Sequence, residues 1–167
     1  MKPEQLEKLQ SLRDYIKTID NPCLIDTSSK IAAICRKFGL VYIGHGANRL
    51  VVRFRTSYTK CYKIALTKHA NNAEHANWQI LANTEFSTYF PRVYDLQDGI
   101  LECAYICGKP LDNLYYYNTE LYNQTWDAII SILKTISARY EINFYDAGDD
   151  NILYDFIRNR FYFVDCY

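Results

Sequence analysis

The sequence contains little of what marks a disordered, fibrous or disulfide-stapled chain. Of its 167 residues only 6 are glycine and 4 are proline, whereas 49% are hydrophobic and 23% are charged. This composition excludes collagen-like and low-complexity proteins. A core at this length can bury roughly 70% of the surface that the unfolded chain exposes, so no covalent or metal staple is needed. We therefore expect the chain to fold as one domain.

An excess of charge and a long apolar run are both missing. The 19 lysines and arginines balance 19 aspartates and glutamates. This balance provides no long-range field that would attract nucleic acid or an anionic membrane, although it is compatible with a local basic patch. No apolar run approaches the roughly 20 residues of a membrane span, and the N-terminus has no apolar signal core. We expect a cytoplasmic protein with neither a membrane nor a nucleic acid as its partner.

The cysteines lack the short spacings of a zinc site. No two of them form a CxxC pair, and several lie in apolar stretches. Zinc sites gather their ligands at short spacings, so the pattern favours buried free thiols over a zinc or disulfide framework. The six residues concerned are Cys23, Cys35, Cys61, Cys103, Cys107 and Cys166.

Two amphipathic helices are predicted ahead of any strand. Apolar residues recur at spacings of three and four between residues 4 and 19, the period of an amphipathic helix. Asn21-Pro22 ends this helix, and polar residues 26–29 offer N-caps for a second helix that stops at Gly39. We treat residues 1–39 as an N-terminal helical extension.

The next segment is rich in β-branched and aromatic residues. Residues 40–44, 49–55 and 60–66 predict three consecutive antiparallel strands. A helix is expected at about 70–81. Two further strands, RVYDLQ and ILECAYI, are joined by a turn at Asp98-Gly99. The pattern therefore predicts a five-stranded antiparallel sheet with one helix.

The last part of the chain predicts a helix and a short hairpin. Residues 111–139 have a helical pattern whose apolar stripe lies within 124–139, and strands NILYD and FYFVD flank a polar turn. An uncovered stripe of this size would mark an interaction site. We expect the N-terminal helices to cover it, or else a second copy of the chain or a partner.

Two glycines and a lysine form the first candidate motif. Gly44-His45-Gly46 lies between two predicted strands, and Lys63 lies within the third. Glycines let backbone N–H groups approach phosphate oxygens, and lysine supplies a point charge. A G-x-G between strands is, however, more often a hairpin turn or a bulge.

The tail contains the second candidate motif. Residues 146–151 fit the spacing D-x-x-x-x-N just before a strand, and Asp165 follows Asn151 by 14 residues at the end of the next strand. Such a hairpin aims an amide and a carboxylate at one point, and oxygen ligands of this kind suit Mg²⁺. Asp146 would accept a proton from an attacking hydroxyl. The alternative is a plain polar turn.

In their order these pieces resemble the protein kinase family over residues 40–167. The resemblance implies an N-lobe at about 40–107 and a minimal C-lobe at about 108–167, both preceded by the two N-terminal helices. The glycine-rich loop of the family is matched by Gly44 and Gly46, and the valine that covers adenine by Val51. Lys63 looks like the lysine of the third strand.

The resemblance implies further site residues. Cys61 stands where the family has a small alanine against adenine, and Glu74 is the candidate partner of Lys63 in a partly exposed ion pair. Leu101-Glu102-Cys103 looks like the hinge, whose backbone groups would bind the adenine edge. The three remaining matches are Asp146 to the catalytic aspartate, and Asn151 and Asp165 to the metal ligands.

Departures from the family pattern concern the catalytic loop and the end of the chain. Phe144 and Tyr145 replace the His-Arg pair before the catalytic aspartate, Gly148 replaces a loop lysine or histidine, and D-F-G reads Asp165-Cys166-Tyr167. The sequence holds no activation loop, no A-P-E motif and no later helices. In this respect the chain is similar to small truncated kinases of phages, viruses and bacterial effectors.

The resemblance implies an ATP- and Mg²⁺-dependent phosphotransferase, a minimal protein serine/threonine kinase, in the host cytoplasm if the chain is viral. The alternative is a pseudokinase that binds nucleotide or a regulatory partner without phosphotransfer. A third possibility is a small-molecule kinase, because aminoglycoside-type kinases share the D-x-x-x-x-N pattern. The N-terminal helices are candidates for a homo-oligomer interface.

Overall fold

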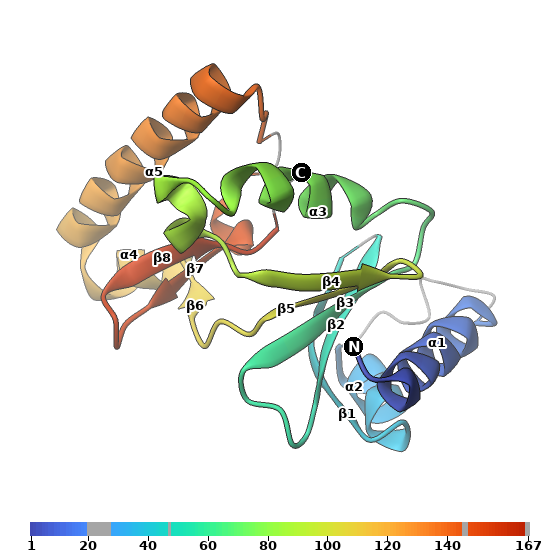
Figure 1. Ribbon diagram of the computed structural model, residues 1–167. Coiled ribbons are helices and arrows are strands. Elements are labelled where there is room, and N and C mark those ends of the chain that lie inside the picture. Colours follow the sequence, from blue (N-terminus) through green and yellow to red (C-terminus); the bar gives the residue numbers. More distant parts are fainter. Residues whose placement is uncertain (20–27, 47, 145–146, 166–167) are drawn as a thin grey trace. The chain divides into compact units, whose positions relative to one another are not determined.

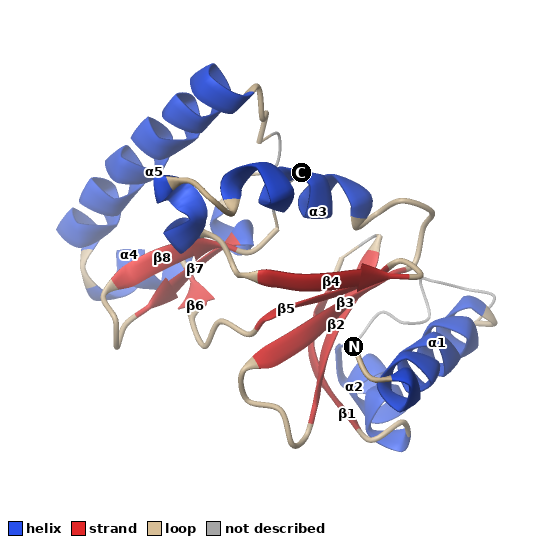
Figure 2. Ribbon diagram, viewed as in Figure 1, coloured by secondary structure: helices blue, strands red, loops and turns tan. Residues whose placement is uncertain are grey.

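The computed structural model describes residues 1–19, 28–46, 48–144 and 147–165, and the chain divides into two compact units (Figure 1). Unit 1 comprises Met1–Asn72 and Val93–Tyr105, and unit 2 comprises Ala73–Arg92 and Ile106–Tyr167. Each unit combines helices with antiparallel strands (Figure 2). The predicted α+β class is therefore confirmed.

Unit 1 contains a five-stranded antiparallel sheet in the order β1-β2-β3-β5-β4. Its strands lie within one or two residues of the predicted ranges, so the expected sheet is confirmed. Their bounds are β1 Leu40–His45, β2 Arg49–Phe54, β3 Lys60–Ala65, β4 Val93–Gln97 and β5 Ile100–Ala104.

The two predicted N-terminal helices form and pack inside unit 1. They are α1 (Pro3–Lys17) and α2 (Ser28–Lys37), and Gly39, with φ of 70°, follows the end of α2. The expected N-caps Asp26 and Thr27 lie outside the described residues. Leu9 and Leu12 of α1 are fully buried in one core with the sheet. The helices are therefore part of the core of this unit.

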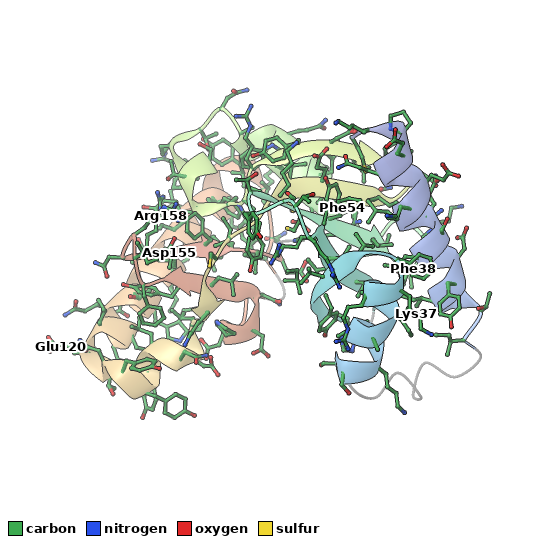
Figure 3. The ribbon with its side chains drawn as sticks, turned by 90° about the horizontal axis from the view of Figure 1, so that it is seen from below. Lys37, Phe38, Phe54, Glu120, Asp155 and Arg158 are labelled. Carbon is green, nitrogen blue, oxygen red and sulfur yellow. The ribbon has the colours of Figure 1, made fainter. Side chains whose placement is uncertain are left out.

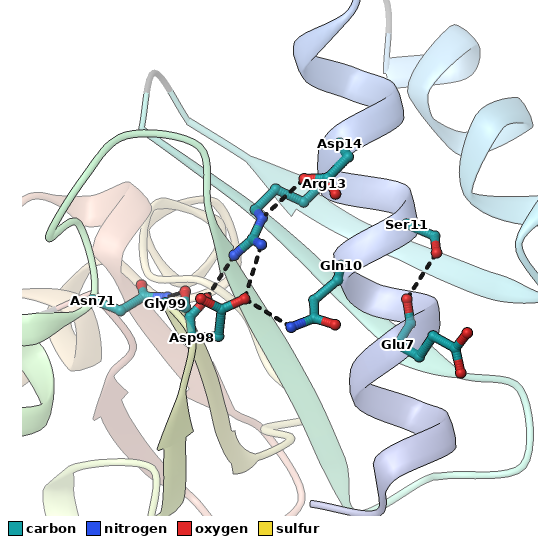
Figure 4. A network of polar contacts seen from close by, with 8 residues as sticks. All are labelled: Glu7, Gln10, Ser11, Arg13, Asp14, Asn71, Asp98 and Gly99. Carbon is teal, nitrogen blue, oxygen red and sulfur yellow. Dashed lines mark hydrogen bonds and ion pairs between the residues drawn. The ribbon is translucent and has the colours of Figure 1, made fainter.

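The turn between β4 and β5 anchors α1. Asp98 and Gly99 have φ of 51° and 73°, the paired left-handed conformation that two-residue hairpins favour. Arg13 donates to the Asp98 carbonyl at 2.6 Å and to its carboxylate at 2.9 Å. Gln10 donates to the same carboxylate at 2.7 Å (Figure 4). A polar clamp thus holds the helix to the turn.

Unit 2 combines a three-stranded sheet, of order β6-β7-β8, with helices. Its strands are β6 Lys109–Pro110, β7 Ile152–Asp155 and β8 Arg160–Phe163. Its helices are α3 Asn72–Leu81, α4 Asp112–Tyr117 and α5 Thr119–Tyr140, and its 3-10 helices are η2 Glu85–Tyr89 and η3 Asp149–Asn151. The predicted helix at about 70–81 and the terminal hairpin are confirmed. The sequence did not predict β6, η2 or η3.

The continuous helical pattern at 111–139 is interrupted. Asn118 adopts an extended conformation with φ of −160° and ends α4. Its side chain accepts a hydrogen bond from the Leu121 N–H at 2.9 Å and so caps the start of α5. Asparagine favours this capping position over a helix interior. The segment is therefore two helices.

The apolar stripe of α5 is covered by unit 2 itself. Ile129 and Ile136 are fully buried in a core with Leu81, Phe90 and Phe163. The rings of Phe90 and Phe163 stack with their centroids 5.1 Å apart. Aromatic residues near η2 and in β8 thus cover the inner face of α5 within unit 2. The apolar residues of α1 that were expected to cover it are buried in the core of unit 1 instead, so that expectation is wrong.

The described cysteines are free thiols. Cys35, Cys61 and Cys103 are buried, as predicted, whereas Cys107 is exposed; Cys23 and Cys166 lie outside the described residues. Burial raises the pKa of Cys35 to about 11. Among the residues that the structure describes, no helix is both long and apolar enough to cross a bilayer.

Candidate functional site

Lys63 lies at the centre of the unit 1 sheet. Its Cα faces Val51 of β2 and Leu101 of β5, and only 4% of the residue is exposed. Burying an ammonium group is costly unless a polar or anionic group accompanies it. A lysine in this position is therefore suited to meeting a negatively charged group inside the fold.

Asn71 fixes the backbone of Lys63. Its side-chain amide donates to the Lys63 carbonyl at 2.7 Å and to the Gly99 carbonyl at 2.8 Å, and Figure 4 shows it beside Gly99. The residue is 1% exposed. Sequence reasoning missed Asn71 because a buried asparagine after a strand forms no periodic pattern.

Three glycines are required by the fold. Gly39 and Gly99 have positive φ, which side chains disfavour. A Cβ on Gly108 would lie 3.0 Å from the Leu153 Cβ and from the Tyr154 carbonyl oxygen. Any larger residue at these positions meets either backbone strain or a close contact.

Neither backbone strain nor a close contact requires glycine at the other three positions. Beyond their immediate chain neighbours, no heavy atom of the described residues lies within 4 Å of where a Cβ on Gly44, Gly46 or Gly148 would be, and none of the three has a positive φ. These are the glycines of the predicted phosphate loop and catalytic loop. Space for a close approach to the backbone is thus present at these positions.

The glycine-rich segment of β1 also contains a bulge, which the sequence predicted as an alternative to a phosphate-binding loop. The register between β1 and β2 shifts between Tyr42 and Gly44, and Gly44 then faces Val51. Beyond the strand, the Gly46 N–H donates to the Arg49 carbonyl at 2.9 Å. The bulge and the open backbone therefore occur together.

Glu102 and Cys103 lie within β5, which pairs with β3 on one side and β4 on the other. The Glu102 side chain is buried, accepts a hydrogen bond from Lys60 Nζ at 2.6 Å and lies 3.4 Å from the Met1 amine. Burial and this carboxylate raise the pKa of Tyr62 to about 12. The structure thus gives this side chain an ion-pairing role, and the adenine contact of the Glu102 and Cys103 backbone stays a prediction.

Cys61 faces Cys103 across the sheet. Their Cα atoms are register partners, and the two Sγ atoms are 3.4 Å apart. Both thiols are buried. The position that the resemblance assigns to a small alanine is thus occupied by a thiol packed against a second thiol.

Glu74 lies in the first turn of α3, in unit 2, and is 6% exposed. Lys63 belongs to unit 1, so their ion pair stays a prediction. The expectation of a partly exposed pair is wrong for both side chains, because each is almost fully buried. Burial makes the loss of either charge more consequential than at a surface.

The β7–β8 hairpin makes Asn151 and Asp165 neighbours within unit 2. Ile152 pairs with Phe163, and the Val164 N–H donates to the Asn151 carbonyl at 2.9 Å. Asp165 directly follows Val164. The predicted amide and carboxylate therefore lie at the same end of one hairpin, whereas Asp146 lies outside the described residues.

The comparisons with known proteins assign no family to the chain. No protein-family model matches it, and no curated protein matches it. The function is therefore inferred from the residues and from the geometry described above.

A network from α5 holds the segment ahead of Asn151. The Tyr122 hydroxyl donates to the Asp149 carboxylate at 3.1 Å, and Trp126 Nε1 donates to the Tyr122 oxygen at 2.7 Å. Burial and then the Asp149 carboxylate raise the pKa of Tyr122, so the hydroxyl stays a donor at neutral pH. Sequence reasoning missed this network. Its only signal is the spacing of four between Tyr122 and Trp126 on one helix face.

A clustered metal centre is not part of the described chain. Its described residues include no group of three or more His, Cys, Asp or Glu side chains that could hold a metal ion. A Mg²⁺ ion bound together with phosphates needs only one or two protein carboxylates. Asn151 and Asp165 supply oxygen donors of the type that suits such a phosphate-assisted Mg²⁺ site.

Proposed function

We propose that the chain binds ATP with Mg²⁺ and transfers the γ-phosphoryl group to a serine or threonine hydroxyl of a protein, as a minimal protein-kinase-like enzyme. One observation carries the proposal: the hairpin register that makes Asn151 and Asp165 neighbours. An amide and a carboxylate oxygen are ligands that suit Mg²⁺ in the presence of substrate phosphates.

Unit 1 supports the nucleotide-binding part of this proposal. Its five antiparallel strands, with α3 between β3 and β4 in the chain, agree with the five-stranded sheet and single helix that the resemblance implies. Lys63 supplies a buried positive charge on β3, and Gly44 and Gly46 offer open backbone. In the proposed site these groups bind the phosphates of ATP.

The proposed chemistry relies on positioning. Bound Mg²⁺ would neutralise phosphate charge. Asn151 and Asp165 supply its protein oxygen ligands, and Asp146 accepts the proton of the attacking hydroxyl. In phosphoryl transfer, orientation and charge stabilisation account for most of the rate enhancement. The network of Tyr122 and Asp149 serves to hold the loop that leads to Asn151.

The test is transfer of label from γ-labelled ATP in the presence of Mg²⁺, with the chain alone and with cell lysate. Wild type is compared with Asp146→Ala and with the control Asp127→Ala, which removes an exposed carboxylate of α5. Label transfer that requires Asp146 but not Asp127 supports the proposal.

Nucleotide binding is measured separately by thermal unfolding. A ligand at a hundredfold excess over its Kd stabilises a fold by about 2.7 kcal/mol, and Asp165→Ala should remove the Mg²⁺-dependent part. Stabilisation by ATP without transfer would select the pseudokinase alternative. No shift at millimolar nucleotide would contradict both.

A further inference from the structure

A long segment of the chain contains no acidic residue. Between Ser28 and Ala73 there is no aspartate or glutamate, although the whole chain has as many acidic as basic residues. This segment forms α2, β1, β2 and β3. Its nine basic residues are Lys30, Arg36, Lys37, Arg49, Arg53, Arg55, Lys60, Lys63 and Lys68. This segment is therefore strongly cationic although the net charge of the whole chain is zero.

Three of these cations line one groove in unit 1. The groove has a volume of about 550 Å³ and includes Arg36 of α2, Arg53 of β2 and Arg55 just after β2. None of the residues that line it is acidic. Among the described residues, Arg36 and Arg55 are exposed and have no ion-pair partner. We call this feature the α2–β2 groove.

An exposed aromatic ring belongs to the same groove. Tyr58 is 74% exposed, and its ring centroid lies 5.1 Å from the Arg53 guanidinium carbon. Arg53 is itself held by a hydrogen bond to the Ser57 carbonyl at 3.1 Å and lies 5.7 Å from the Tyr105 ring. A cation–π contact of this kind orients the ring. The ring thus remains available to a flat ligand while its position is restrained.

We propose that the α2–β2 groove binds single-stranded nucleic acid. Arg36 and Arg55 contact backbone phosphates, and a base stacks on Tyr58. Grooves that combine cationic side chains with exposed aromatic rings bind single strands through charge and stacking without reading sequence. An acidic or phosphorylated peptide would use the arginines but would leave the ring without a planar partner. The proposal is independent of phosphotransfer and replaces the expectation, drawn from net charge, that nucleic acid is not a partner.

The probe is a 5′-fluorescein-labelled oligouridylate of twelve nucleotides, titrated with the full chain and followed by anisotropy at several salt concentrations. Arg36→Gln/Arg55→Gln should weaken binding at least tenfold. It should also reduce the slope of log K against log salt by about 1.4, because each phosphate contact on a single strand contributes about 0.7. Tyr58→Leu should weaken binding about tenfold, whereas Tyr58→Phe, which keeps the ring, should not.

The matched control is Lys17→Gln/Lys134→Gln, which removes the same charge from exposed residues outside the groove. It should change the affinity less than twofold, and circular dichroism should show that all variants fold. Equal weakening by both double variants would overturn the proposal, as would an absence of binding. Displacement of the RNA by saturating ATP with Mg²⁺ would assign the binding to the nucleotide site. Tighter binding of a phosphopeptide that depends on the same arginines would identify a protein partner.

Discussion

The hydroxyl group of Tyr122 donates to the carboxylate of Asp149, two residues ahead of Asn151. The bond joins the first half of α5 to η3. Trp126 donates to the same hydroxyl oxygen, so one helix face supplies two members of the network. The long helix therefore helps to orient the segment that enters the β7–β8 hairpin.

Tyr122→Phe leaves the ring but removes both the hydrogen bond to Asp149 and the acceptor of Trp126 Nε1. We expect a loss of about 1–3 kcal/mol in the free energy of unfolding, because two bonds that each contribute about 0.5–1.5 kcal/mol are lost. If the network positions Asn151, kcat should fall while the KM for ATP stays the same. The control is Tyr117→Phe, at a ring that is 69% exposed. Equal kinetics for the two variants would show that the bond is only structural.

We expect the Asp155 carboxylate to stabilise the turn of the β7–β8 hairpin. This carboxylate accepts hydrogen bonds from the backbone N–H groups of Ile157 and Arg158, both at 3.0 Å, and from the Arg158 guanidinium at 2.6 Å. Figure 3 labels Asp155 and Arg158. Asp155 is 1% exposed. Asp155→Ala removes three hydrogen bonds that the turn makes to one buried carboxylate, one of them from a charged guanidinium, and should cost about 1–3 kcal/mol in urea unfolding. Asp127→Ala should cost far less, and a similar loss in both would contradict this role of the turn.

Acid should destabilise the protein through two carboxylates. Hydrogen bonds from Gln10 and Arg13 lower the pKa of Asp98. Burial opposes ionisation of Asp155, but its bonds from Arg158 and Ile157 lower that pKa overall. A lowered folded-state pKa contributes stability above the unfolded value of about 3.9, and this contribution is lost as the pH falls through the folded value.

Urea unfolding between pH 7 and pH 2.5 measures this loss. Asp98→Asn should flatten the pH dependence below about pH 4, because the titrating group is gone. A stability that rises on acidification in this range would show that the two carboxylates do not control it.

Glycine substitutions separate folding from ligand binding. Gly44→Ala and Gly46→Ala should leave stability unchanged or raise it by about 0.4–1 kcal/mol each, since a Cβ fits and the unfolded chain loses freedom. Both should weaken ATP binding if phosphates approach this backbone. Gly99→Ala, at φ of 73°, should instead destabilise the fold. If Gly44→Ala and Gly46→Ala bind ATP with unaltered affinity, the two glycines do not belong to the nucleotide site.

Lys63→Met preserves length and removes the charge. If Glu74 is its partner, the single change leaves a buried carboxylate unpaired and should cost about 3–5 kcal/mol. Lys63→Met/Glu74→Gln should recover much of that stability and stay inactive. A double variant whose stability loss is the sum of the two single losses would show that the two side chains do not interact.

Local patterns were sufficient for much of the fold. The spacing of apolar residues predicted α1 and α2, and β-branched runs bounded by turn residues predicted all five strands of unit 1. Asp98-Gly99 and Gly39 were found because each has a conformation that its residue type favours. The hairpin of Asn151 and Asp165 was also found, since its strands are short and adjacent in the chain.

Features that depend on distant contacts were missed. Asn71 acts on Lys63 of β3 and on Gly99 in the turn between β4 and β5, which are far apart in the chain. The cover of α5 was predicted incorrectly because packing from η2 and β8 depends on tertiary contacts, which no local period encodes. Asn118 was missed for another reason: its capping bond from Leu121 is local, but the apolar pattern on both sides of it favoured one continuous helix.

The acid-free segment also has a consequence for how the protein behaves in concentrated solution. Unit 1 has 13 basic and 8 acidic residues, and unit 2 has 6 and 11. Near pH 6.8 the molecule carries no net charge, so copies do not repel one another, while oppositely charged units of different copies attract. Salt at about 0.15 M reduces the reach of this attraction to about 8 Å. The protein should therefore be least soluble at neutral pH in dilute buffer, and should dissolve when salt is added.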